Sequence, residues 1–138
     1  MRILVIDGQG GRLGRRLLEG IRKICPEDEI MAVGTNSMAT ENMMNSGCAT
    51  HLATGENAVV VACRRAQLIV GPLGIAMADA LMGEITPAMA VAVTRSSARR
   101  ILIPMNLCDT YVAGVARGSG AILEDALEMI RKVAEETL

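Results

Sequence analysis

Residues 3–14, ILVIDGQGGRLG, join a compact apolar run to a helical pattern through four glycines. The run from Ile3 to Ile6 is short and rich in β-branched residues, which predicts a strand buried on both faces. Apolar residues then recur at helical spacing, at Leu13, Leu17, Leu18, Ile21 and Ile24. The stretch therefore predicts a strand, a glycine turn and a helix with no spare residue between them.

Such a turn leaves the first amides of the helix unpaired, at the positive end of the helix dipole, and phosphate is their usual ligand. The glycines can be aligned in two ways. The spacing Gly8-x-x-Gly11-x-x-Gly14 matches many nucleotide-binding turns, whereas Gly8-x-Gly10 does not complete the G-x-G-x-x-G pattern because Leu13 stands where its third glycine would be. No Lys-Ser/Thr pair of a P-loop follows. We predict phosphate or nucleotide binding by Gly8, Gln9, Gly10, Gly11, Arg12 and Gly14. The alternative is that the glycines only permit close packing of the strand on the helix.

The composition limits the class of protein. The chain has 138 residues, which fits one domain spanning residues 1–138. It has no Trp or Phe, one Tyr and ten Met, so the core is expected to be aliphatic and rich in methionine. The methionines either fill gaps in that core or form an adaptable surface for a ligand or a subunit.

The charge and the cysteines exclude several classes. A net charge of −1 and the near absence of aromatic residues argue against a nucleic-acid-binding protein. The four cysteines form no C-x-x-C pair, which is typical of reduced thiols in the cytoplasm. No signal peptide and no apolar run of about 18 residues is present, so we expect a cytoplasmic protein without a membrane span.

Strand-like and helix-like patterns alternate along the chain. We predict strands at 3–6, 30–33, 49–52, 68–70, 101–103 and 111–115, and helices at 13–25, 37–45, 57–65, twice within 75–93, and from 119 onward. This order predicts an α/β fold, a three-layer Rossmann-like sandwich with the first strand in the centre. The gap at 105–110 is too short for a parallel crossover, so the last strand should be an antiparallel edge strand in a mostly parallel sheet.

In this topology the loops after four strands meet at one edge of the sheet and line a cleft. We therefore add to the candidate cofactor-binding residues Asn36, Ser37, Thr54, Gly55, Glu56, Asn57, Gly71 and Gly74. Each also has a structural explanation. Asn36 or Ser37 can cap a helix, Glu56 can be held by a helix dipole, and the two glycines can serve a tight turn.

The identity of the cofactor stays open between NAD(P) and another nucleotide. An NAD site usually offers an Asp or Glu to the ribose after the second strand, whereas this chain has Gly34-Thr35-Asn36-Ser37 there. That departure weakens the prediction of NAD but leaves a phosphorylated small molecule as the expected ligand.

No catalytic set is recognisable. Asp7, Glu56 and His51 are the candidate acid or base residues, and whether the protein is an enzyme stays open. Cys48 and His51 have a ligand-like spacing, but no further Cys or His lies near them, so we expect no metal site. The segment 75–93 is almost wholly apolar, and it forms either core or, as we expect, a subunit interface of a homo-oligomer.

Two motifs carry a resemblance to a known family. The sequence resembles a family of short bacterial proteins of unknown function with D-G-Q-G-G near the start, here residues 7–11, and T-G-E-N-A in the middle, here residues 54–58. The similarity extends over nearly the whole chain and includes residues 34–37 and 83–87. It implies a single small cytosolic domain, and it supplies no catalytic residues.

Overall fold

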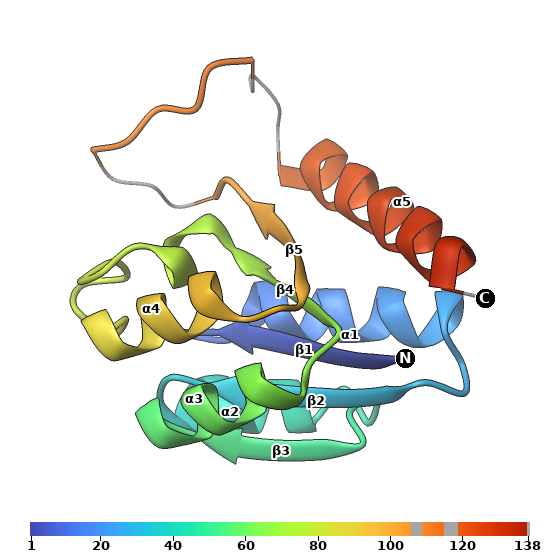
Figure 1. The fold of residues 1–138 in the computed structure, drawn as a ribbon, viewed down its shortest axis with the longest axis horizontal. Helices are drawn as coiled ribbons and strands as arrows, with labels where there is room; N and C mark the ends of the chain where they lie inside the picture. Colours follow the sequence, from blue (N-terminus) through green and yellow to red (C-terminus); the bar gives the residue numbers. More distant parts are fainter. Residues whose placement is uncertain (106–108, 115–118, 138) are drawn as a thin grey trace.

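The computed structural model describes residues 1–105, 109–114 and 119–137. They form a five-stranded parallel sheet in the order β3-β2-β1-β4-β5, with helices on both faces (Figure 1). The elements are β1 (Arg2–Asp7), α1 (Arg12–Ile24), β2 (Glu29–Gly34), α2 (Ser37–Met44), β3 (His51–Thr54), α3 (Glu56–Arg65), β4 (Leu68–Pro72), the 3₁₀ turn η1 (Leu73–Ala76), α4 (Pro87–Arg95), β5 (Arg99–Ile103) and α5 (Ser119–Thr137). The α/β class and the central place of β1 are confirmed.

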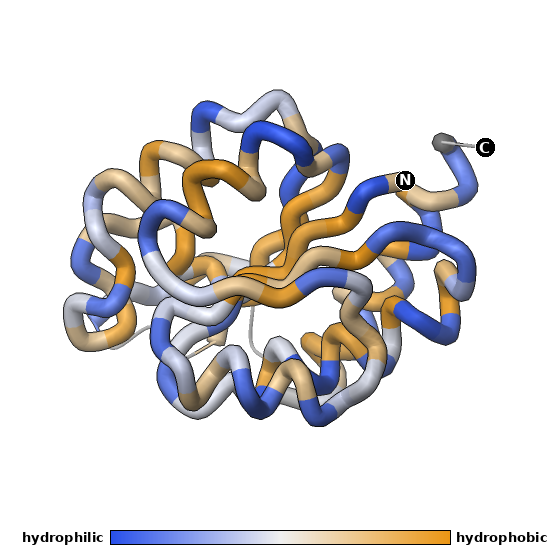
Figure 2. Tube along the Cα trace, turned by 90° about the horizontal axis from the view of Figure 1, so that it is seen from below, coloured by the Kyte–Doolittle hydropathy of each residue, from blue (hydrophilic) through white to orange (hydrophobic). Residues whose placement is uncertain are grey.

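The central strand divides the core into two layers. Ile3 and Val5 pack with α1, α2 and α5, whereas Leu4 and Ile6 pack with α3 and α4. Alternate side chains of a strand point to opposite faces, so a run that is apolar throughout serves both layers. Figure 2 shows this apolar centre between more hydrophilic helices.

The helix starts follow local sequence signals. Asn36 accepts a hydrogen bond from the amide of Ala39, and Thr86 accepts one from the amide of Met89, so both residues cap the helices that follow them. In α5 the stripe of Leu123, Ala126, Ile130 and Val133 is buried on the same layer as α1. Among the described residues, no helix is long and apolar enough to cross a bilayer.

The expected antiparallel edge strand is not found. Residues 111–114 have no strand pairing and include a turn at 113–114, and Val115 lies outside the described residues. Tyr111 is 95 % exposed, so its side chain does not pack on the sheet. An apolar and aromatic pattern favours a strand through the packing of its side chains on neighbouring residues, and the pattern alone does not form one. Within the described residues the sheet ends at β5 and is wholly parallel.

Two further predictions need correction. The first helix expected within 75–93 is replaced by η1 and an irregular segment, 77–86, in which Asp79, Leu81 and Met82 have positive φ. The apolar side chains of 75–93 that are buried in the core are those of Ile75, Ile85, Met89, Ala90 and Val93, and those of Ala76, Ala80, Leu81 and Ala92 are partly buried and pack against it. The strand expected at 49–52 begins two residues later, at His51.

Candidate functional site

A cavity of about 250 Å³ lies at the carboxyl end of β1. Its lining consists of Asp7, Gly8, Gln9, Gly10, Gly11, Arg12, Leu13, Pro72 and Leu81. The chain leaves β1 toward one face of the sheet through α1, and leaves β4 toward the other face through η1 and α4. Ligands of open α/β sheets bind at such a switch point, so the cavity occupies the position that the topology favours.

The turn that forms this cavity depends on Gly11. Its φ is +72°, in the left-handed region, and its amide donates to the carbonyl oxygen of Gly8 at 2.9 Å. A Cβ atom at Gly11 would lie 2.6 Å from the carbonyl oxygen of Ala39 in α2. Glycine here therefore serves both the backbone conformation and the close approach of α2.

The carboxylate of Asp7 joins the two ends of the turn through hydrogen bonds. Its side chain is buried, and its Oδ1 and Oδ2 accept hydrogen bonds from the amides of Gly8 at 2.8 Å and Gly14 at 2.7 Å. Burial raises the pKa of Asp7; the two amide bonds lower it, Glu84 raises it further, and the net result is a raised pKa. Gly14 is the third residue of α1, so the buried carboxylate of Asp7 caps the N-terminus of this helix by accepting from one of its first amides.

Three amides of the turn stay without a partner. Among the described residues, the amides of Gly10, Arg12 and Leu13 make no hydrogen bond, and the exposed guanidinium of Arg12 makes no ion pair. All three residues line the cavity. Unpaired amides at a helix N-terminus, next to a free cation, attract an anion.

Glu84 connects the segment 77–86 to the glycine turn by hydrogen bonds. Its Oε1 accepts hydrogen bonds from the amide of Gln9 at 2.9 Å, from Thr35 Oγ1 at 2.8 Å and from Asn36 Nδ2 at 2.6 Å. Burial alone would raise the pKa of Glu84, but these three hydrogen bonds outweigh it and lower the pKa. A single carboxylate oxygen thus joins the loops that follow β1 and β2 to the segment that precedes α4.

This contact leads to a prediction about Glu84→Ala. We expect the substitution to lower the free energy of unfolding by about 1–2 kcal/mol at pH 7, because Thr35 Oγ1 and Asn36 Nδ2 both lose the carboxylate acceptor, and Asn36 Nδ2 keeps only its bond to the carbonyl oxygen of Gln9. A carboxylate with a lowered pKa stabilises the fold above its unfolded pKa, near 4.5, and this contribution disappears as the pH falls through the folded pKa. Urea unfolding of both proteins across this range should therefore show the difference shrinking in acid, and a pH-independent difference would contradict the assignment.

The other predicted site residues lie outside the cavity. Gly14 is buried. Asn36 contacts a residue of the cavity lining, because its Nδ2 donates a hydrogen bond to the carbonyl oxygen of Gln9 at 3.0 Å. The remaining candidates do not line it: Ser37, Thr54, Gly55, Glu56, Asn57, Gly71 and Gly74. Two of them have structural contacts, since Thr54 Oγ1 lies 2.7 Å from Thr40 Oγ1, and Glu56 accepts a hydrogen bond from Thr86 Oγ1 at 2.6 Å.

No sequence pattern assigned a role to Leu81 or Glu84. Both lie in 77–86. Residues 83–87, which include Glu84, carry part of the family resemblance, and this was the available signal for Glu84. His51 lies away from the turn, at the start of β3, with its Nε2 3.6 Å from Glu29 Oε1. Within the described ranges, no group of three metal-ligating side chains occurs.

Comparisons with known proteins give a family and a distant structural likeness. No curated protein matches the sequence. One similar solved structure is a dodecameric FMN-dependent Ubix-like decarboxylase from Escherichia coli O157:H7, with 15% sequence identity and a TM-score of 0.48 over 100% of this chain and 95% of that chain. The domain of unknown function DUF3842 matches residues 2–136. The chain therefore belongs to the DUF3842 family, whose function is unknown.

Proposed function

We propose that this protein binds a small phosphorylated molecule, such as a nucleotide, with its phosphate group at the glycine turn. The observation that carries the proposal is that one cavity contains the amides of Gly10, Arg12 and Leu13 and lies beside the Arg12 side chain, none of which has a partner in the part of the chain that the structure describes. Phosphate oxygens can accept from all of these donors at once. Each such charge-assisted bond contributes about 1.5–3 kcal/mol when it is shielded from water.

The size of the cavity supports a phosphate group rather than a whole dinucleotide. Its volume of about 250 Å³ lies below the usual range for sites of drug-sized ligands, roughly 300–1,000 Å³. The remainder of the ligand must then extend beyond the turn. The segment after β2 offers no carboxylate for a ribose, and Asn36 Oδ1 already caps α2, so a nucleotide other than NAD fits this edge better.

Binding or sensing fits the site better than catalysis. Both carboxylate oxygens of Asp7 hold the turn, and Glu84 holds the segment above it. Glu84 also does not line the cavity. We therefore assign these two acids to shaping the site.

Gly10→Ala tests the proposal. A Cβ atom at Gly10 would meet only Arg12 Cγ, at 4.0 Å, so the variant should fold normally while its methyl group crowds the anion. We expect the unmodified protein to bind at least one of inorganic phosphate, ATP, GDP, NAD, NADP and coenzyme A in calorimetry, and Gly10→Ala to bind it about tenfold more weakly.

Gly120→Ala is the matched control. A Cβ atom there has no neighbour within 4 Å, and Gly120 lies in α5, so ligand affinity should not change. Absence of binding at millimolar concentration for the whole panel would reject the proposal, as would equal weakening by both substitutions.

A homo-oligomeric interaction module is the second candidate function. Large exposed apolar side chains occur on the three elements at the β3 edge of the sheet: Met38 and Met44 on α2, Leu52 on β3 and Val61 on α3. An exposed edge strand with apolar neighbours is a common interaction surface. Light scattering that shows a monomer over a wide range of concentration would reject this candidate.

A further inference from the structure

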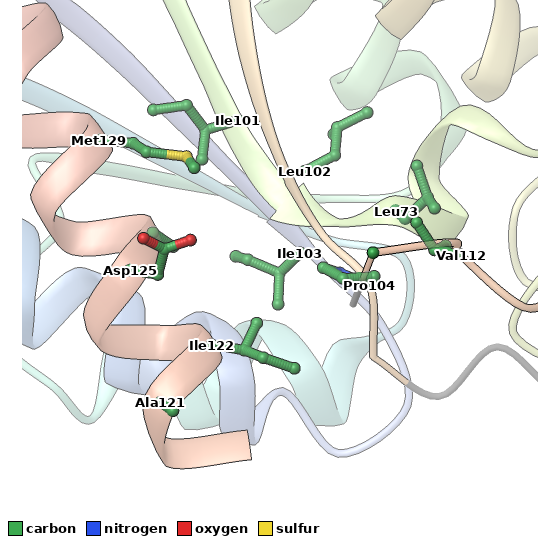
Figure 3. Close-up of a pocket in the computed structure, with 12 residues that line it drawn as sticks. Leu73, Ile101, Leu102, Ile103, Pro104, Val112, Ala121, Ile122, Asp125 and Met129 are labelled. Atoms are coloured by element: carbon green, nitrogen blue, oxygen red, sulfur yellow. The ribbon is translucent and has the colours of Figure 1, made fainter. Parts of the chain in front are cut away.

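A second cavity, of about 530 Å³, lies between β5 and α5 (Figure 3). Its described lining is mainly apolar and includes Leu73, Ile103, Pro104, Ala121, Ile122 and Met129. Figure 3 shows Ile103 on the β5 side and Ile122 on the α5 side of this space. The volume lies within the range of sites that bury most of a small organic molecule.

The two cavities meet at one point of the chain. Pro72, the last residue of β4, lines the glycine-turn cavity, and Leu73, the next residue, lines the second cavity. Leu13 of the turn and Ile122 of α5 also pack against the same apolar cluster. The two cavities therefore lie next to each other where β4 ends.

The polar groups of the two cavities differ. Among the described residues, the first cavity has the amides of the glycine turn that lack a partner and the Arg12 guanidinium, beside the carboxylate of Asp7, whose two oxygens are already hydrogen-bonded to backbone amides. The described lining of the second cavity has one charged residue, Asp125, which disfavours an anion there. A ligand that spans both must place its phosphate at the turn and an uncharged part between β5 and α5.

We propose that the ligand is an amphipathic phosphate ester, with its phosphate at the glycine turn and an apolar ring in the second cavity. This inference rests on the proposed phosphate site and adds the chemistry of the rest of the ligand. Burial of a ring of the size of a large apolar side chain provides about 10- to 100-fold in affinity beyond that of the phosphate alone.

The test compares 2-naphthyl phosphate with inorganic phosphate in calorimetry. We expect the naphthyl ester to bind at least about tenfold more tightly. Ala121→Trp should reduce this advantage, because the exposed Ala121 lines the second cavity and an indole there would occupy part of it, while inorganic phosphate should bind as before. Ala88→Trp, at an exposed alanine early in α4 that lines neither cavity, should change neither affinity.

The outcomes separate the two proposals. If both probes bind equally, or if Ala121→Trp weakens both equally, the amphipathic ligand is rejected, while binding that Gly10→Ala weakens still supports the phosphate site. If neither probe binds, both proposals fail. Equal effects of Ala121→Trp and Ala88→Trp on the naphthyl ester would also reject the second cavity as the site of the ring.

Discussion

Gly11→Ala is expected to lower the free energy of unfolding by about 3 kcal/mol, the sum of two separate costs. The φ of Gly11 is +72°, which costs an alanine about 1–2 kcal/mol. The new Cβ atom would also lie 2.6 Å from the oxygen and 2.7 Å from the Cα of Ala39. Both atoms belong to the backbone of α2, so α2 must shift away from the turn, at a further cost of about 1–3 kcal/mol.

Urea unfolding followed by circular dichroism measures this loss, and Gly10→Ala is the control in the same turn. The neighbouring substitution meets only Arg12 Cγ at 4.0 Å, so its free energy of unfolding should stay within about 0.5 kcal/mol of the unmodified protein. Comparing the two variants distinguishes Gly11, which the backbone conformation requires, from Gly10, which we assign to ligand binding. Equal losses in the two variants would contradict the geometry described for the turn.

The first βα unit could be predicted from sequence because its signals are local. Ile3 to Ile6 are apolar without a break, and Leu17, Leu18 and Ile21 recur at the helical period, so strand and helix follow from neighbouring residues. The parallel sheet with β1 at its centre then follows from the right-handed crossovers of alternating strands and helices. The same reasoning places Gly8 to Gly11 at the carboxyl edge, where the cavity lies.

The remainder of the site depends on contacts between distant residues. Glu84 meets the amide of Gln9 across 75 positions of the chain, and no local pattern links the two residues. In 77–86, Leu81 and Met82 adopt positive φ against their own preference. Such a conformation persists only where tertiary contacts hold it, and here Leu81 lies over the glycine turn. The apolar composition of the segment predicted a helix, but in the structure tertiary contacts hold these residues in an irregular conformation instead.

Asp7→Ala is expected to lower the free energy of unfolding by about 2–4 kcal/mol, because it leaves the buried amides of Gly8 and Gly14 without an acceptor. The raised pKa of Asp7 fixes how this loss varies with pH. A carboxyl group whose folded pKa exceeds its ordinary value of 3.8 contributes most below that value, and its contribution declines as the pH rises through the folded pKa. Urea unfolding at several pH values should show the loss largest in acid and smaller, but constant, near neutrality.

Phosphate should return part of this stability. Without the carboxylate, the amides of Gly8 and Gly14 can join those of Gly10, Arg12 and Leu13 in binding an anion from solution. An anion present at 100 times its dissociation constant stabilises the fold by about 2.7 kcal/mol. We expect phosphate to raise the midpoint of unfolding of Asp7→Ala more than that of the unmodified protein, with sodium chloride at equal ionic strength as the control.

Asp7→Asn separates the charge of Asp7 from its shape. The amide oxygen can accept from only one of the Gly8 and Gly14 amides, so this variant should lose less stability than Asp7→Ala and should bind phosphate more tightly than the unmodified protein. Phosphate that stabilises all three proteins equally would mean that the anion binds elsewhere. In the native chain, Asp7 thus already supplies one anion to the start of α1, and any ligand must bind beside it, at the amides that Asp7 leaves unpaired.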